Sequence, residues 1–160
     1  MVCTRPEREP SSRNDNLEIP DQLKIYLRRR ERCVFEVREH LKKISHTSNI
    51  DDLIEELQET GLVDDSRFCE NRIRYRVKNS RWGDDKIRFE LKKLRIANEL
   101  IEKYITTVPL EEWLPSLEKV LRKTGFSDSG GFDEIVEVRK KLSGKGFSDA
   151  LSYKLLKEFK

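Results

Sequence analysis

The segment IRFELKKL, residues 87 to 94, decides the fold because it occurs in three diverged copies. VREHLKKI, residues 37 to 44, matches it at an offset of 50 residues, and VRKKL, residues 138 to 142, matches its first five positions at an offset of 51. A second helical pattern follows each copy: LIEEL from residue 53, LIEKY from residue 100 and LSYKL from residue 151. A register shared across two helices is typical of repeat proteins, and it predicts a three-helix unit that is present three times.

Composition predicts an all-α protein with a thin interior. Charged residues make up 39% of the 160 residues and hydrophobic residues 36%, and amphipathic helices bury so little apolar surface most economically. Prolines, glycines and polar residues divide the chain into nine expected helices. We expect them at residues 21–32, 34–44, 50–60, 65–79, 86–94, 99–105, 110–124, 132–142 and 149–159, with caps at Asp64 or Asp65, at Asn98 and at Ser148.

The expected helices fall into three repeats, which we place at residues 20–62, 63–108 and 109–160. Residues 1–19 are polar and contain two prolines ahead of Pro20, so we expect a disordered tail there. Residues 124–133 include SDSGG and are expected to form a mobile loop.

The stretch RIRYRVKNSR, residues 72 to 81, allows two interpretations. Its alternation of bases with Ile, Tyr and Val favours a β-strand. A lone strand among helices would lack a pairing partner, so we predict a helix over residues 65–79. On that helix Arg72 and Arg76 fall on the largely apolar side. They either extend toward solvent or pair with Asp64 or Asp65, or else contact a partner directly.

Charge is segregated along the chain, although 33 Lys+Arg nearly balance 30 Asp+Glu. Residues 51–70 contain eight acids and one base, residues 72–95 ten bases and three acids, and residues 21–46 eight bases and four acids. One such run is usually a solvated helix face, but two basic runs in a small protein favour a polyanionic partner. The candidate contact residues are Arg72, Arg74, Arg76, Lys78, Arg81, Lys86, Arg88, Lys92 and Lys93.

The sequence contains no recognisable catalytic or metal motif. Its three cysteines and two histidines are widely spaced, so we expect no metal and no cofactor, and we interpret Cys33 and Cys69 as buried thiols. A phosphate-binding glycine loop and a nucleophile paired with a base are both missing, so we do not expect an enzyme. Neither an apolar leader nor an apolar run of membrane length occurs, and we expect a cytoplasmic protein.

One motif resembles a known family. GLVDDSRFC, residues 61 to 69, followed by Arg76, Gly83, Ile87 and Glu90-Leu91, is similar to the signature of the RecX family, which are bacterial regulators of the recombinase RecA. That signature is G-L-[IL]-D-D-x-R-[FY]-A, then a basic helix, then G-x-x-x-I-x-x-E-L. The resemblance is strongest over residues 53–105. It continues weakly into RERC at residues 30–33 and KGFS at residues 145–148, while Arg95 stands where the family usually has Gly.

The resemblance implies an elongated, curved solenoid of three tandem three-helix repeats, which we expect to be a monomer. RecX proteins bind the filament that RecA forms on DNA and modulate, most often inhibit, its ATPase and strand-exchange activities. They act in DNA repair, homologous recombination and the SOS response, and some also bind single- or double-stranded DNA. A rod with acidic and basic faces fits such a role, because it could contact protein protomers and phosphates together, with an affinity that falls as salt rises.

Two other classes of function stay open at this point. The short helices and tight turns also suit a helix-turn-helix-like regulator that binds duplex DNA directly. A scaffold for another protein is the second possibility. We expect Trp82 and Trp113 to lie in the core, with Trp82 stacking on a base or anchoring a partner as the alternative.

Overall fold

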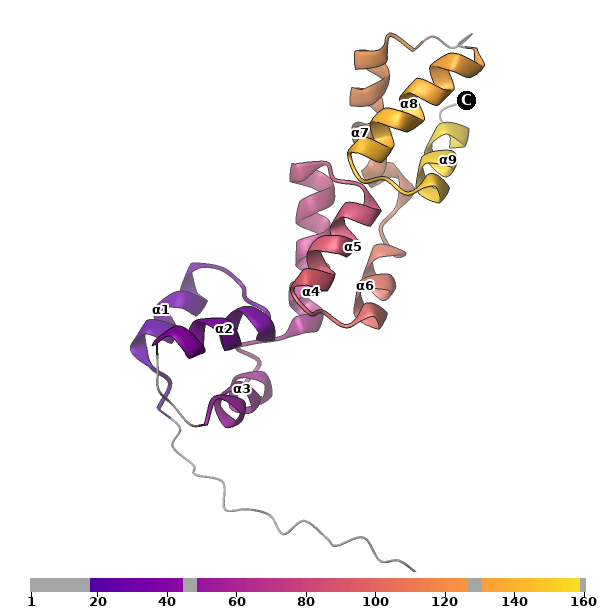
Figure 1. Cartoon of the computed structure of the whole chain (residues 1–160). Helices are drawn as coiled ribbons and strands as arrows, with labels where there is room; N and C mark the ends of the chain where they lie inside the picture. The colour runs from indigo at the N-terminus through magenta and orange to yellow at the C-terminus, as the bar shows by residue number, and fades with distance from the viewer. Residues whose placement is uncertain (1–17, 45–48, 127–130, 159–160) are drawn as a thin grey trace, which may run out of the picture.

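The computed structural model describes residues 18–44, 49–126 and 131–158. Within these ranges the chain forms nine α-helices and one π-helical turn, and no strand. The helices follow one another in three groups of three along an elongated, curved body (Figure 1). The predicted all-α repeat architecture is therefore confirmed. The elements are α1 (Asp21–Arg29), α2 (Val34–Ile44), α3 (Ile50–Glu59), α4 (Asp65–Tyr75), η1 (Arg76–Ser80), α5 (Asp84–Lys93), α6 (Asn98–Ile105), α7 (Leu110–Thr124), α8 (Phe132–Gly144) and α9 (Asp149–Glu158).

Most helix ends lie where the sequence predicts them. The Asp64 side chain accepts hydrogen bonds from the backbone N–H groups of Ser66 and Arg67, so Asp64 is the cap of α4. Ser148 likewise accepts one from the N–H of Leu151 at the start of α9. These side chains satisfy N–H groups that have no partner inside the helix.

Some predicted helix ends are wrong. α5 begins at Asp84 rather than at residue 86, and α8 continues to Gly144 rather than ending at residue 142. α1 ends at Arg29 rather than near Arg32, because the chain turns to an extended conformation at Arg30. Asn98 is the first residue of α6 and not its cap; Ala97 precedes the helix, and no side chain caps it. The predicted tail up to residue 17 lies outside the described residues, as do residues 127–130 of the predicted loop. Ile19 packs against the apolar cluster of the first group.

The alternating stretch from residue 72 to 81 is helical, as predicted. α4 continues into the π turn η1, and the helix ends at Arg81, whose φ of 52° is left-handed. Left-handed backbone is common at helix ends but usually belongs to Gly. Arg95 takes a similar φ of 56° just after α5.

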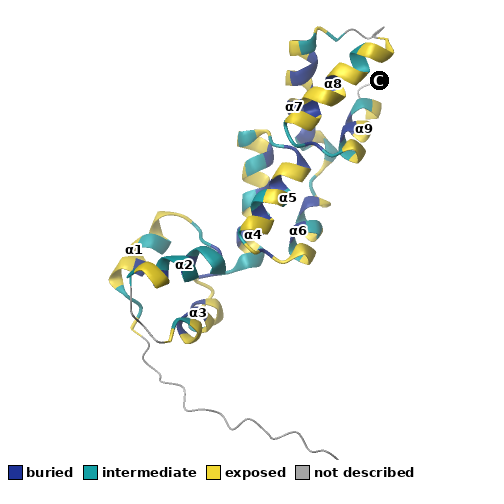
Figure 2. Cartoon of the chain, in the orientation of Figure 1, coloured by how far each residue is buried: buried dark blue, intermediate teal, exposed yellow. Residues whose placement is uncertain are grey.

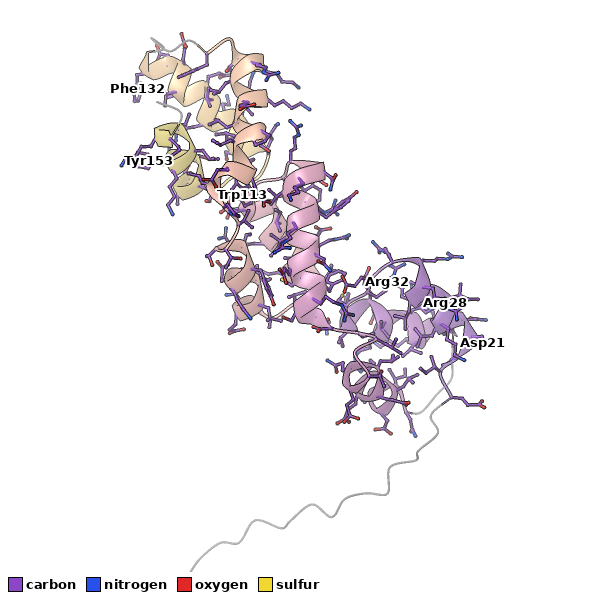
Figure 3. All side chains as sticks on the ribbon, turned by 180° about the vertical axis from the view of Figure 1, so that it is seen from behind. Asp21, Arg28, Arg32, Trp113, Phe132 and Tyr153 are labelled. Carbon is purple, nitrogen blue, oxygen red and sulfur yellow. The ribbon has the colours of Figure 1, made fainter. Side chains whose placement is uncertain are left out.

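The apolar interior consists of two clusters. One lies within the first group of helices and contains Leu23, Val37, Leu41, Leu53, Ile54, Leu57 and Val63. The other runs continuously through the second and third groups, from Phe68 on α4 to Leu155 on α9. Buried residues accordingly line the inside of each group (Figure 2). Trp113 is buried in the second cluster, as expected, and lies where the third group meets the middle one (Figure 3).

The first group joins the middle one through polar contacts and through Cys33 and Phe35. The backbone N–H of Val34 donates to Oδ1 of Asp65 over 2.8 Å, and Glu31 accepts from both Arg67 and Asn71. Cys33, just before α2, is buried against the cluster of the second and third groups. The start of α2 is thereby attached to the start of α4.

The middle and third groups meet at two glycines. A Cβ on Gly83 would lie 2.2 Å from the backbone nitrogen of Phe147, and one on Gly146 would lie 2.3 Å from Cβ of Lys86. Gly146 also has a φ of 83°, which L side chains rarely adopt. This approach lets the carbonyl of Gly146 accept from the N–H groups of Asp85 and Lys86, at 2.9 and 3.2 Å. Backbone hydrogen bonds therefore connect the start of α5 directly to the turn before α9.

Candidate recombinase and nucleic-acid interface

Arg72 and Arg76 are attached to a carboxylate of the neighbouring helix α5. Nε of Arg76 donates to Oε2 of Glu90 over 2.8 Å, its Nη2 donates to Oε1, and Nη2 of Arg72 lies 3.1 Å from the same Oε1. The side chains of Arg72 and Arg76 are only 21% and 19% exposed. The hydrogen bonds that Arg76 donates to Glu90 raise the pKa of Arg76 further. The expected pairing with Asp64 or Asp65 is therefore wrong: both arginines pair inside the protein, and Glu90 is their partner.

Arg88 is the third candidate that pairs internally. Its guanidinium lies between Asp84 and Glu102, with Nε of Arg88 2.9 Å from Oε1 of Glu102. Burial alone would lower the pKa of Arg88, but the hydrogen bonds that Arg88 donates to Glu102 and Asp84 outweigh that effect and raise it. Asp84 is itself buried, and its other oxygen accepts from the N–H of Ser148. Arg88 thus neutralises a carboxylate that also caps the turn before α9.

Arg74 and Lys78 lie instead on an exposed stripe of α4 and η1. Their side chains are 64% and 62% exposed, and their contacts with Glu70 at 2.8 Å and Glu112 at 3.9 Å are surface ion pairs. Such pairs contribute about 0–1 kcal/mol and are easily exchanged for another anion. Exposed Tyr75 adjoins this stripe, next to Arg74 in sequence and three residues before Lys78. We call Arg74, Tyr75 and Lys78 the α4 face.

A second exposed basic stripe follows α5. Lys86, Phe89 and Lys93 recur at helical spacing, and Lys92 adjoins them. Nζ of Lys93 lies 4.4 Å from the centre of the Phe89 ring, and among the described residues none of the three lysines pairs with an acid. We call Lys86, Phe89, Lys92 and Lys93 the α5 face. Its aromatic ring is exposed among cations, an arrangement in which bases and backbone phosphates can both be contacted.

Trp82 is half-buried and stands between the two helices. The guanidinium of Arg76 lies 4.0 Å, and Nζ of Lys86 4.2 Å, from the centre of its ring. Trp82 also packs against the larger apolar cluster. Its ring is therefore engaged within the middle group, which favours the core interpretation over stacking on a base.

The cysteines and carboxylates of the described residues do not gather into a metal site. Cys33 and Cys69 are free and buried, as expected, and burial raises the pKa of each thiol to about 11. Burial also raises the pKa of Asp65, partly offset by the N–H of Val34. The residues with assigned structure contain no group of three or more potential metal ligands. None of the described helices is both long and apolar enough to cross a membrane.

The fold and the exposed charges define a class, a tandem three-helix repeat protein with two basic faces on its middle unit. Comparison with known proteins shows which family this chain resembles. Residues 64–105 match the family model described as RecX, second three-helix domain. A comparison of the sequence with the curated proteins finds no match.

Solved structures share the fold over most of the chain. The crystal structure of RecX from Lactobacillus salivarius matches with a TM-score of 0.72 and 21% identity, covering 86% of this chain and 92% of that one. A crystal structure described as regulatory protein RecX matches with a TM-score of 0.69 and 19% identity, covering 86% of this chain and 69% of that one. The resemblance to the RecX family, first visible in the motif, is thereby confirmed.

The sequence analysis did not predict that Glu90 and Glu102 are the internal partners of the arginines. For Glu90, however, the sequence contains a signal. Glu90 belongs to the quoted motif, in which a glutamate stands three residues after Ile87. A role as the acceptor for Arg72 and Arg76 would explain why the motif has a glutamate there. Glu102 carries no such signal. Its distance of 14 residues from Arg88 reflects how α6 folds back on α5.

Proposed function

We propose that this protein regulates a RecA-type recombinase by binding the filament that the recombinase forms on DNA, and that it inhibits ATP hydrolysis and strand exchange. It does so without chemistry of its own, as a monomer that lies along the filament in the cytoplasm. The RecX fold and the family match of the middle unit support this proposal. The observation that carries it is the pair of exposed basic faces on that same unit.

The two faces, rather than all nine basic candidates, make the contacts in this proposal. Arg72, Arg76 and Arg88 already pair with Glu90, Asp84 and Glu102, so using them for a partner would leave partly buried acids without a cation. The exposed bases do not neutralise a buried acid, so a partner can contact them without leaving such an acid unpaired. Cations at exposed positions attract a polyanion over several ångströms, and their effect weakens as salt screens it. The exposed contact residues of the two faces are Arg74, Lys78, Lys86, Lys92 and Lys93, whereas Arg81 lies outside both faces and donates to the carbonyl of Pro115 on α7.

The elongated shape supports binding along a polymer. Three groups of helices in succession present a surface much longer than that of a compact protein of this size (Figure 1). Such a body can contact neighbouring recombinase protomers and the enclosed DNA together. Each contact adds to the others, because the second and later contacts form within one complex.

DNA-dependent ATP hydrolysis by the cognate recombinase tests the proposal. We expect wild type to inhibit hydrolysis in a concentration-dependent way. Two charge-reversal doubles, Arg74→Glu with Lys78→Glu and Lys92→Glu with Lys93→Glu, examine the α4 and α5 faces separately. The matched control reverses two exposed lysines of the third group that form no ion pair with any described residue, Lys154→Glu with Lys157→Glu.

The outcomes separate the possible functions. Weaker inhibition by one or both face doubles, with the control close to wild type, supports the proposal and assigns the face. Equal inhibition by all variants would remove both faces from the mechanism. Lack of inhibition by wild type, together with sequence-selective binding to bare duplex DNA, would favour the helix-turn-helix-like regulator instead.

A further inference from the structure

A third group of cations lies apart from the two faces, where the middle and third groups of helices meet. Its members come from three segments: Arg81 follows η1, Lys119 and Lys123 lie on α7, and Lys145 lies in the turn between α8 and α9. We call these four residues the junction cluster. Only Arg81 among them belongs to the basic run that the sequence singles out.

Backbone and side-chain contacts bring the cluster together. Nη1 of Arg81 donates to the carbonyl of Pro115 on α7 over 3.2 Å. Lys119 and Lys123 follow Pro115 at intervals of four residues and therefore lie along the same side of α7. The carbonyl of Lys145 accepts from the N–H of Gly83, two residues after Arg81, over 3.1 Å. The cations thus surround one point where α7, the end of η1 and the α8–α9 turn meet.

The cluster has no counter-charge in the described structure. Among residues 18–44, 49–126 and 131–158, no acid forms an ion pair with Arg81, Lys119, Lys123 or Lys145. Glu112, seven residues before Lys119 on α7, already lies 3.9 Å from Nζ of Lys78, and Glu118 lies 3.8 Å from Nη2 of Arg122. Burial first, and then the charges of Lys119, Lys123 and Arg81, lower the pKa of Lys145. The four cations repel one another, and an anion placed among them would relieve that repulsion.

We propose that the junction cluster is a binding site for the phosphate groups of a nucleic-acid strand. Lysines are flexible point charges suited to phosphates, and two of these four follow a helix at a rise of about 6 Å, so they can contact successive groups of a chain-like anion. The exposed large hydrophobic residues of the described structure lie elsewhere, at Ile25, Leu62, Tyr75, Phe89, Phe132, Val136 and Tyr153. A protein partner usually needs an apolar centre, which favours nucleic acid over an acidic protein segment.

A strand bound at the junction cluster would affect how the middle and third groups of helices pack. Phosphates bound there contact α7 and the α8–α9 turn of the third group as well as Arg81 of the middle one. Binding therefore stabilises the packing of these two groups, which share one apolar cluster. The proposal does not depend on the recombinase as target, since the strand is contacted by this chain alone.

The test uses the full chain and a fluorescein-labelled oligodeoxythymidine, without recombinase. Fluorescence anisotropy over a range of KCl concentrations compares wild type, the junction variant Lys119→Gln/Lys123→Gln/Lys145→Gln, and the control Lys140→Gln/Lys154→Gln/Lys157→Gln. The two variants lose the same charge, and the control lysines are also exposed and unpaired among the described residues. We expect the junction variant to lose on the order of tenfold in affinity and about 2 units of the slope of log K against log salt, because each single-strand phosphate contact contributes about 0.7.

Thermal unfolding provides a second readout that also checks folding. We expect the free junction variant to melt at or above wild type, since it has lost like-charge repulsion, and the oligonucleotide to raise the melting temperature of wild type but not of the junction variant. Equal losses of affinity in the junction and control variants would overturn the proposal. A second result would also overturn it: wild type binds polyglutamate, and the junction variant loses this binding but binds the oligonucleotide unchanged. The site would then serve an acidic protein segment. A chain that leaves the recombinase unaffected can still pass this test, so the two proposals fail separately.

Discussion

Arg76 and Glu90 join η1, the continuation of α4, to α5 through two parallel hydrogen bonds, one of them 2.8 Å from Nε of Arg76 to Oε2 of Glu90. Arg72 shares the same carboxylate. Two arginines and one glutamate leave this cluster with one excess positive charge, and the ring of Trp82 lies against the guanidinium of Arg76. The arrangement orients the two helices that carry the exposed basic faces, so we interpret it as the structural support of the proposed interface.

Replacing Glu90 should destabilise the protein more than replacing an exposed glutamate of the same unit. Glu90→Gln leaves Arg72 and Arg76 partly buried without a counter-charge, and we expect a loss of about 2–3 kcal/mol, less than the 3–5 kcal/mol of a fully buried pair because both arginines keep some solvent contact. Glu70→Gln, which removes the surface partner of Arg74, should cost at most about 0.5 kcal/mol. Urea unfolding measures both. Similar small losses in the two variants would show that the Glu90 cluster is not structural.

The close approach of the middle and third groups predicts a sharp difference between two neighbouring glycines. Gly146→Ala would place its Cβ against Cβ of Lys86 in a left-handed conformation, so we expect a loss of about 2 kcal/mol or more. Gly144→Ala meets nothing within 4 Å at the end of α8, and it should be neutral or stabilising by about 0.5–1 kcal/mol. Thermal unfolding compares them directly. Tolerance of Gly146→Ala would mean that the junction does not form as described.

The buried thiols predict a dependence of stability on alkaline pH. Burial raises the pKa of Cys33 and of Cys69 to about 11, from an ordinary value of 9.0. The unfolded chain therefore loses these protons at lower pH than the folded one, so their contribution is complete below about pH 9 and is lost as pH rises through 11. We expect the free energy of unfolding to fall more steeply over that interval in wild type than in Cys33→Ala/Cys69→Ala. The comparison concerns slopes, because the alanines also leave small cavities. Parallel slopes would contradict the burial of the thiols.

The cap of α4 predicts a further loss that depends on hydrogen bonding alone. Asp64→Ala removes the acceptor for the N–H groups of Ser66 and Arg67, and we expect it to cost about 1 kcal/mol. Asp64→Ser retains an acceptor at the same position and should recover most of that loss. Chemical denaturation distinguishes the two variants. If serine were as harmful as alanine, the carboxylate would be needed for some purpose other than capping.

Local sequence signals were sufficient for the repeat and for most helix ends. The match between residues 37–44 and 87–94 predicted two helices that occupy equivalent places in their groups, and Asp64 and Ser148 cap where predicted. Helix formation and helix caps depend on residues that are close together in the sequence. The apparent strand pattern of residues 72–81 was also resolved correctly, because the helices around it left no partner for a strand.

Contacts between distant segments were not predictable in the same way. The pairing of Arg76 with Glu90 and of Arg88 with Glu102 depends on how helices fold back on one another. The junction cluster combines Arg81 with lysines that lie dozens of residues later, so no local pattern indicates it. Asn98 was mistaken for a cap because the sequence does not reveal that α6 begins one residue earlier, directly after Ala97.

Binding of the chain to the recombinase filament, measured against salt, tests the central claim most directly. Fluorescently labelled wild type and the two face doubles, Arg74→Glu/Lys78→Glu and Lys92→Glu/Lys93→Glu, are titrated with filaments assembled on DNA. We predict that wild type binds with an affinity that falls steeply as salt rises, and that at least one double binds more weakly with a shallower dependence. Binding by both doubles with the affinity and salt dependence of wild type would contradict the account.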